Sequence, residues 1–146
     1  TNHQSVKKTE KSMQKEINQI KKYCNSLTQF SRYKTREVHI GDVPLGGNNP
    51  IRIQSMTTTD SMNTVATVEQ TIRMVEAGCE YVRITAPSIN EAKNLEAIKK
   101  ELKARGYTVP LIADIHFTPN AAEMAARIVE KVRVNPGKYV YKKKFD

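Results

Sequence analysis

The chain has 146 residues, 38% of them hydrophobic and 27% charged, which is typical of one soluble globular domain. Its formal net charge of +9 comes from the two ends: residues 1–37 hold nine Lys or Arg against three Glu, residues 138–146 hold four Lys against one Asp, and the middle has eleven charges of each sign. Basic ends on a neutral body are usually solvated, so we do not expect nucleic-acid binding to be the main function.

Cysteine use and hydropathy exclude two further classes. Cys24 and Cys79 lie 55 positions apart without CxxC or Cys/His spacing, so we expect neither a disulfide framework nor a metal cluster held by this chain alone. No apolar run approaches the roughly 18 residues that span a membrane, and no signal-peptide core follows the basic start. We therefore expect a cytoplasmic protein with no membrane partner. Because the chain starts without Met and stops just after a βα repeat, we also expect a fragment.

Residues 1–36 are predicted to form a basic N-terminal helix and a linker, followed by a second domain over residues 37–146. Apolar residues recur at steps of four and three along residues 7–27: Met13, Ile17, Ile20, Cys24 and Leu27. This spacing predicts a helix with one narrow apolar stripe, which either packs on its own body or binds a partner. Residues 31–36 are polar and predict the linker.

A β-hairpin is predicted at the start of the second domain. Residues 37–41 alternate polar and apolar, and the alternating residues Ile51-Arg52-Ile53-Gln54 follow a turn cluster at residues 46–50. We expect the turn cluster to be the hairpin loop and the second arm to continue into a first parallel strand over residues 51–55. The glycines of this cluster are not followed by a helix, so a phosphate-binding loop is not favoured.

Strands and helices then alternate. Apolar runs at residues 81–84, 111–115 and 132–134 predict three more strands, and the segments between them have helical spacing. The helices carry their own start and stop signals, namely Asn63 or Thr64 before the first, Gly78 after it, the capping box Ser88 to Glu91, Gly106, and Thr118 with Pro119 before the third. Four βα units after a hairpin predict an α/β fold, the first half of a TIM-type barrel, with a doubly wound domain as the alternative.

Candidate binding residues lie on these strands. Arg83 and Arg133 each interrupt an apolar strand, where an arginine is costly unless it meets an anion. Guanidinium groups match phosphate oxygens, so the pair predicts a phosphorylated or diphosphate ligand; the alternative is internal pairing, such as Arg83 with Asp114. Asp114 and His116 are two residues apart and would share one face, with Asp114 able to orient an imidazole, a substrate hydroxyl or an arginine. Two such residues are too few for a metal site.

Four stretches together carry a family resemblance: residues 53–57 (IQSMT), 81–84 (YVRI), 113–117 (ADIHF) and 132–137 (VRVNPG). Over roughly residues 37–142 the chain resembles 4-hydroxy-3-methylbut-2-en-1-yl diphosphate synthase, an oxidoreductase of the non-mevalonate isoprenoid pathway. The resemblance implies two-electron reduction of 2-C-methyl-D-erythritol 2,4-cyclodiphosphate to 4-hydroxy-3-methylbut-2-enyl diphosphate. It also implies electrons from ferredoxin or flavodoxin, and a [4Fe-4S] cluster held by a C-terminal domain outside this chain.

The resemblance assigns substrate-binding roles, and no catalytic or metal-binding residue, to this part of the enzyme. The positions are Arg83 and Arg133 for diphosphate oxygens, Asp114 and His116 beside them, and, as weaker candidates, Asn135 and Gln54. The family motif continues Asn-Pro-Gly-Asn, whereas this chain has Lys138, so that last role is not transferred. We expect the chain alone to be inactive and to form homo-oligomers. A pterin- or phosphosugar-binding barrel and a basic-tailed interaction module remain as alternative functions.

Overall fold

The structure is a computed structural model that describes residues 26–116 and 118–141. The chain divides into two compact units, Thr1–Thr35 and Arg36–Asp146, and every helix and strand named below belongs to the second. The amphipathic helix predicted over residues 7–27 falls almost wholly outside the described residues. The described part of the first unit, residues 26–35, has neither helix nor strand.

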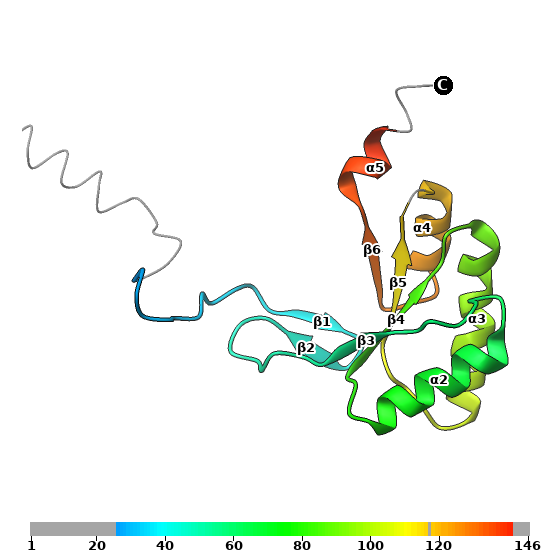
Figure 1. Cartoon of the computed structure of the whole chain (residues 1–146), viewed down its shortest axis with the longest axis horizontal. Helices are drawn as coiled ribbons and strands as arrows, with labels where there is room; N and C mark the ends of the chain where they lie inside the picture. Colours follow the sequence, from blue (N-terminus) through cyan, green and yellow to red (C-terminus); the bar gives the residue numbers. More distant parts are fainter. Residues whose placement is uncertain (1–25, 117, 142–146) are drawn as a thin grey trace, which may run out of the picture. The chain divides into compact units, whose positions relative to one another are not determined.

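A parallel four-stranded sheet forms the centre of the second unit (Figure 1). Its strands lie side by side in chain order, and each is joined to the next through a helix. The strands are β3 (Gln54–Met56), β4 (Tyr81–Thr85), β5 (Leu111–Ile115) and β6 (Lys131–Val134), and the helices are α2 (Thr64–Glu76), α3 (Ile89–Ala104), α4 (Pro119–Ala126) and, after β6, α5 (Pro136–Tyr141). The predicted α/β fold with parallel βα units is confirmed.

The main hydrophobic core lies between one face of this sheet and α2, α3 and α4 (Figure 1). Alternate residues of β4 and β5 point into it, including Val82, Ile84, Ala113 and Ile115. Helices on a single face favour a barrel wall over a doubly wound sheet, which carries helices on both faces. The opposite face is therefore free to hold polar residues.

The helix ends follow the sequence signals with one exception. Asn63 Oδ1 accepts a hydrogen bond from the Ala66 amide at 3.1 Å, and Ser88 Oγ accepts one from the Asn90 amide at 3.2 Å while it also bonds the Glu91 carboxylate. Thr118 precedes α4 as predicted, but its hydroxyl makes no cap and donates instead to the carbonyl of Pro87 at 3.2 Å. This bond ties the loop after β5 to the loop after β4.

Helical spacing predicts that Val65 lies on one face with Val68, Ile72 and Val75, and two details of the predicted packing and strands were wrong. Val65 is exposed on α2, whereas Thr67 and Thr71 are buried; the Thr71 hydroxyl donates to the Thr67 carbonyl, which satisfies it inside the helix. The first parallel strand was expected over residues 51–55, but β3 begins at Gln54, and the side chains of Ile51 and Ile53 are exposed. Periodicity alone did not separate the strand from the segment that leads into it.

The hairpin exists, but its second arm was wrongly predicted. β1 (Val38–Ile40) pairs antiparallel with β2 (Val43–Leu45), so the loop is the two-residue turn Gly41–Asp42 and not the cluster at residues 46–50. Gly41 has a φ of +59°, which suits a tight two-residue hairpin loop. Residues 51–54 do not pair with β1.

The hairpin packs on the amino end of the helix-free sheet face. Ile40 forms a second apolar cluster with Tyr81 and Ile112, joined by Val43 and Leu45. The Tyr81 hydroxyl donates to the Val43 carbonyl at 3.0 Å, and burial raises the pKa of this tyrosine. The hairpin therefore covers the amino ends of β4 and β5. Along residues 26–116 and 118–141, no helix is both long and apolar enough to cross a membrane.

Candidate anion-binding site

Three charged residues from three neighbouring strands meet on the helix-free face of the sheet. Arg83 lies on β4, Asp114 on β5 and Arg133 on β6, and Asp114 is in register with Arg133. Arg83 Nη2 lies 3.1 Å from Asp114 Oδ2, and Arg133 Nη1 lies 3.1 Å from Asp114 Oδ1. Each carboxylate oxygen therefore has its own guanidinium group.

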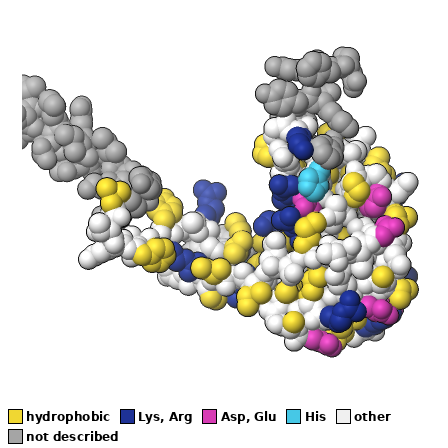
Figure 2. Space-filling view, in the orientation of Figure 1, with side chains coloured by type: hydrophobic (Ala, Val, Ile, Leu, Met, Phe, Trp, Pro, Cys, Tyr) yellow, Lys and Arg dark blue, Asp and Glu magenta, His cyan; other side chains and the backbone are white. Residues whose placement is uncertain are grey.

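Burial and charge are distributed unevenly within this cluster. The Asp114 side chain is 1% exposed, whereas those of Arg83 and Arg133 are 31% and 40% exposed. Two guanidinium groups against one carboxylate leave one positive charge in excess, on the side that solvent reaches. Figure 2 shows Lys and Arg side chains gathered there around a histidine and an acidic group. The arrangement suits an anion that approaches from the open side.

Two buried atoms of the same cluster lack a hydrogen-bond partner. In the described part of the chain, the buried side-chain atoms without one are Thr57 Oγ1, Arg83 Nε and Asp114 Oδ2. Folded proteins satisfy most buried polar atoms, so two orphans in one cluster need an explanation. Asp114 Oδ2 is compensated by charge, because Arg83 Nη2 lies 3.1 Å away, although the two atoms do not form a hydrogen bond.

The other predicted site residues take up different positions. His116 Nε2 lies 3.9 Å from Asp114 Oδ2, so Asp114 and His116 share a face as expected. Asn135 follows β6 directly, and its Oδ1 accepts from the Lys138 amide at 3.4 Å. Gln54 opens β3 in register with Tyr81, so its expected place at the end of the first strand was wrong. Lys138 is exposed.

Thr57 belongs to the stretch 53–57 that carries the family resemblance, but the sequence assigned it no role in the site. It follows β3 directly, is buried, and donates its amide to the Arg83 carbonyl at 2.9 Å. Its unpartnered hydroxyl therefore lies beside the backbone of an arginine of the cluster. A hydroxyl residue in the first position after a parallel strand was the available signal, because ligands collect at that end of such sheets.

Internal pairing and ligand binding were the two alternatives for the arginines. The internal pairs form, and they involve both arginines instead of Arg83 alone. One carboxylate neutralises the charge of only one of the two guanidinium groups. Ligand binding therefore stays a prediction that this geometry favours.

The residues that the structure describes do not fit an iron–sulfur cluster. Cys79 is the cysteine among them, and no group of three His, Cys, Asp or Glu side chains within the described ranges comes together as a metal site. A [4Fe-4S] cluster needs several thiolate or carboxylate ligands in one place. No step of chemistry is therefore assigned to such a cluster in this part of the chain.

Comparisons with known proteins agree with the fold. The family model described as the GcpE TIM-barrel domain matches residues 35–146. A 4-hydroxy-3-methylbut-2-en-1-yl diphosphate synthase (flavodoxin) of Akkermansia muciniphila is 54% identical over 124 residues, which cover 85% of this chain and 21% of that protein. The proteins of the same name from Parabacteroides distasonis and Protochlamydia amoebophila are 58% identical over 115 residues and 53% over 123, covering 79% and 84% of this chain and 19% of each protein. The chain thus spans about a fifth of the length of these curated relatives.

Proposed function

Since the chain belongs to the GcpE family, we propose that residues 36–141 supply the substrate-binding first part of the TIM barrel of a 4-hydroxy-3-methylbut-2-en-1-yl diphosphate synthase. In this proposal the whole enzyme reduces 2-C-methyl-D-erythritol 2,4-cyclodiphosphate by two electrons, opens its ring and releases 4-hydroxy-3-methylbut-2-enyl diphosphate. The described residues hold the diphosphate group during that reaction.

One observation carries the proposal: two arginines from alternate strands meet at one buried carboxylate and leave an excess positive charge on an open face. Each guanidinium group has further N–H donors beyond those directed at Asp114, and these are free to meet phosphate oxygens in parallel pairs. Asp114 fixes both groups before the ligand arrives, so less side-chain entropy is lost on binding. The chain's contribution to the reaction is therefore positioning and charge neutralisation.

The neighbouring residues take supporting roles in this proposal. His116 and Thr57 border the cluster and would offer hydrogen-bonding groups to the substrate, whereas Asn135 lies at the carboxyl end of β6. Gln54 is the weakest candidate because it starts its strand. We assign the redox chemistry to a [4Fe-4S] cluster held outside the described residues, with a flavodoxin as electron donor as in the names of the relatives. We also propose that the enzyme is cytoplasmic.

Calorimetry on the complete chain tests the proposed site. We expect the cyclodiphosphate to bind the unaltered protein, and Arg83→Met and Arg133→Met each to weaken binding by about tenfold or more, because each removes charge-assisted hydrogen bonds worth roughly 1.5–3 kcal/mol. Arg105→Met is the matched control, since Arg105 directly follows α3 and pairs with Glu101 of that helix, away from the site.

The same titration separates the alternative barrel functions. A pterin or a sugar phosphate that bound more tightly than the cyclodiphosphate would contradict the proposed substrate. Equal losses in Arg105→Met and Arg133→Met would show that binding follows overall charge and not this site.

A further inference from the structure

A short sequence pattern occurs twice, on the two strands that carry the arginines. Residues 80–83 read Glu-Tyr-Val-Arg and residues 130–133 read Glu-Lys-Val-Arg, 50 positions apart. In both copies the glutamate directly precedes the strand, β4 or β6, and the arginine is the third residue of that strand. The repeat makes the glutamates candidates for a shared role toward the arginines.

The first glutamate holds the segment that enters β3. Glu80 Oε2 accepts from the Ile53 amide at 2.9 Å, while the Glu80 amide donates to the Ile53 carbonyl at 2.8 Å. Glu80 Oε1 pairs with Arg52 Nη1 at 2.8 Å. The Ile53 amide is the largest of the interactions that hold the pKa of Glu80 below its ordinary value, and Arg52 acts in the same direction.

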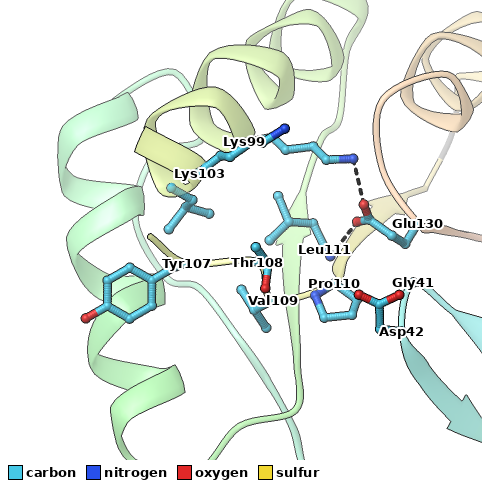
Figure 3. Close-up of a pocket in the computed structure, with 11 residues that line it drawn as sticks. Gly41, Asp42, Lys99, Lys103, Tyr107, Thr108, Val109, Pro110, Leu111 and Glu130 are labelled. Atoms are coloured by element: carbon cyan, nitrogen blue, oxygen red, sulfur yellow. Dashed lines mark hydrogen bonds and ion pairs between the residues drawn. The ribbon is translucent and has the colours of Figure 1, made fainter. Parts of the chain in front are cut away.

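The second glutamate repeats this contact on the β5–β6 pair. Glu130 Oε2 accepts from the amide of Leu111, the first residue of β5, at 2.9 Å, and Glu130 Oε1 pairs with Lys99 Nζ at 2.6 Å (Figure 3). The same ammonium donates to the Ile128 carbonyl at 2.6 Å. The hairpin turn packs closely here, since a Cβ atom on Gly41 would lie 3.3 Å from Glu130 Cγ.

Glu130 and Arg133 are three residues apart, and the residues that they contact on β5 are also three residues apart. Glu130 bonds Leu111 at the amino end of the β5–β6 pair, and Arg133 meets Asp114, three residues further along each strand. On the β3–β4 pair, Glu80 bonds Ile53, and three residues further Arg83 is in register with Met56. Three residues of strand span about 10 Å, so each glutamate fixes its own strand against the preceding one about 10 Å before the arginine.

We propose that Glu80 and Glu130 are positioning residues of the anion site, which set the height of Arg83 and Arg133 by holding the amino end of the preceding strand. Each acts through a carboxylate oxygen that accepts a backbone N–H, and the partner cations Arg52 and Lys99 hold that carboxylate in place. The ligand class, a diphosphate, rests on the proposed function.

A purely structural role would predict lost stability with unchanged ligand affinity, so affinity is the quantity to measure. Inorganic pyrophosphate is the probe, titrated into the complete chain at a temperature where each variant is folded by circular dichroism. We expect Glu130→Ala to weaken pyrophosphate binding by about tenfold, because displacements of about 1 Å at a charged site have effects of this size or larger.

Matched variants separate the acceptor oxygen from the charge and from stability. Glu130→Gln keeps an oxygen for the Leu111 amide, so it should bind within about twofold of the unaltered protein. Glu130→Asp keeps the charge but withdraws the oxygen by one carbon and should weaken binding as Glu130→Ala does. Glu130 and Lys99 line a pocket of about 330 Å³, and Leu102 lies in its wall. Leu102→Ala, a buried change, should lower stability without changing affinity.

The outcomes distinguish this inference from the proposed function. If Arg133→Met abolishes pyrophosphate binding while Glu130→Ala and Glu130→Asp bind normally, the positioning role is wrong and the binding site stands. If the unaltered chain does not bind pyrophosphate, the proposed function fails and this inference fails with it. If Glu130→Ala does not fold, Glu130→Asp and Glu80→Ala give the same readout, and unchanged affinity in both would overturn the positioning role.

Discussion

At the scale of single residues, the site depends on one buried carboxylate shared by two arginines. Burying Asp114 is costly, and its two ion pairs with Arg83 and Arg133 offset that cost. The sequence predicted each of these residues as a candidate, because an arginine within an apolar strand and an acid at a strand end stand out from their neighbours. The sequence did not predict that both arginines pair with the same carboxylate, since this pairing depends on the register of three strands.

Energetic coupling between Arg83 and Asp114 is the first prediction at this scale. Asp114→Asn removes the carboxylate charge, and Arg83→Met removes one partner while keeping much of the side-chain volume. We expect the two changes to be non-additive in the free energy of unfolding by about 1–2 kcal/mol, as found for residues in contact. Urea unfolding of both single variants and the double variant measures this coupling, and additive effects would show that the pair contributes nothing to stability.

The pH dependence of stability at Glu80 is the second. The pKa of Glu80 lies below its ordinary value of 4.5 in the folded protein, mainly because the Ile53 amide donates to its carboxylate. Its stabilising contribution is therefore fully present above pH 4.5 and is lost as the pH falls through the lowered pKa. The free energy of unfolding should decrease more between about pH 6 and about pH 3.5 for the unaltered chain than for Glu80→Gln, whose side chain does not titrate. Parallel losses in the two proteins would rule out this contribution.

At the scale of elements, local signals predicted what local interactions determine. The capping box at Ser88 and Glu91 and the glycines Gly78 and Gly106 were read correctly, because each acts within one turn of its helix. The hairpin arm was misread because its turn lies at Gly41, whereas the glycine-rich cluster at residues 46–50 gave the stronger turn signal. Thr118 was misread because a tertiary contact with Pro87 took its hydroxyl away from the helix end.

The N-cap of α3 gives a prediction for a single element. Ser88 Oγ accepts from the Asn90 amide and also bonds Glu91, whose pKa is lowered chiefly by that hydroxyl. We expect Ser88→Ala to lower the free energy of unfolding by about 1 kcal/mol, the usual cost of losing an N-cap. Ser55→Ala, at an exposed position of β3, is the control and should change stability by much less. Urea unfolding curves compare the two, and equal effects would mean that the cap is not a stabilising contact.

At the scale of the whole molecule, the described sheet has two edge strands, β3 and β6, each with one neighbour. Apolar side chains lie exposed along the segment that enters β3, where Ile51 is 85% and Ile53 is 59% exposed. Unpaired strand edges beside exposed apolar groups favour association with further strands. In a closed barrel such an edge would pair with another strand of the barrel.

Self-association of the 146-residue chain is therefore expected when it is purified alone, and light scattering should report species larger than a monomer. The double change Ile51→Lys and Ile53→Lys should reduce this association, because lysine on an exposed edge opposes edge-to-edge pairing. Val65→Lys is the matched control: Val65 is also exposed, but it lies on α2, so the same added charge should leave association nearly unchanged. A well-behaved monomer of the unaltered chain would contradict the open-edge interpretation. Equal effects of the edge and helix lysines would instead attribute the association to net charge.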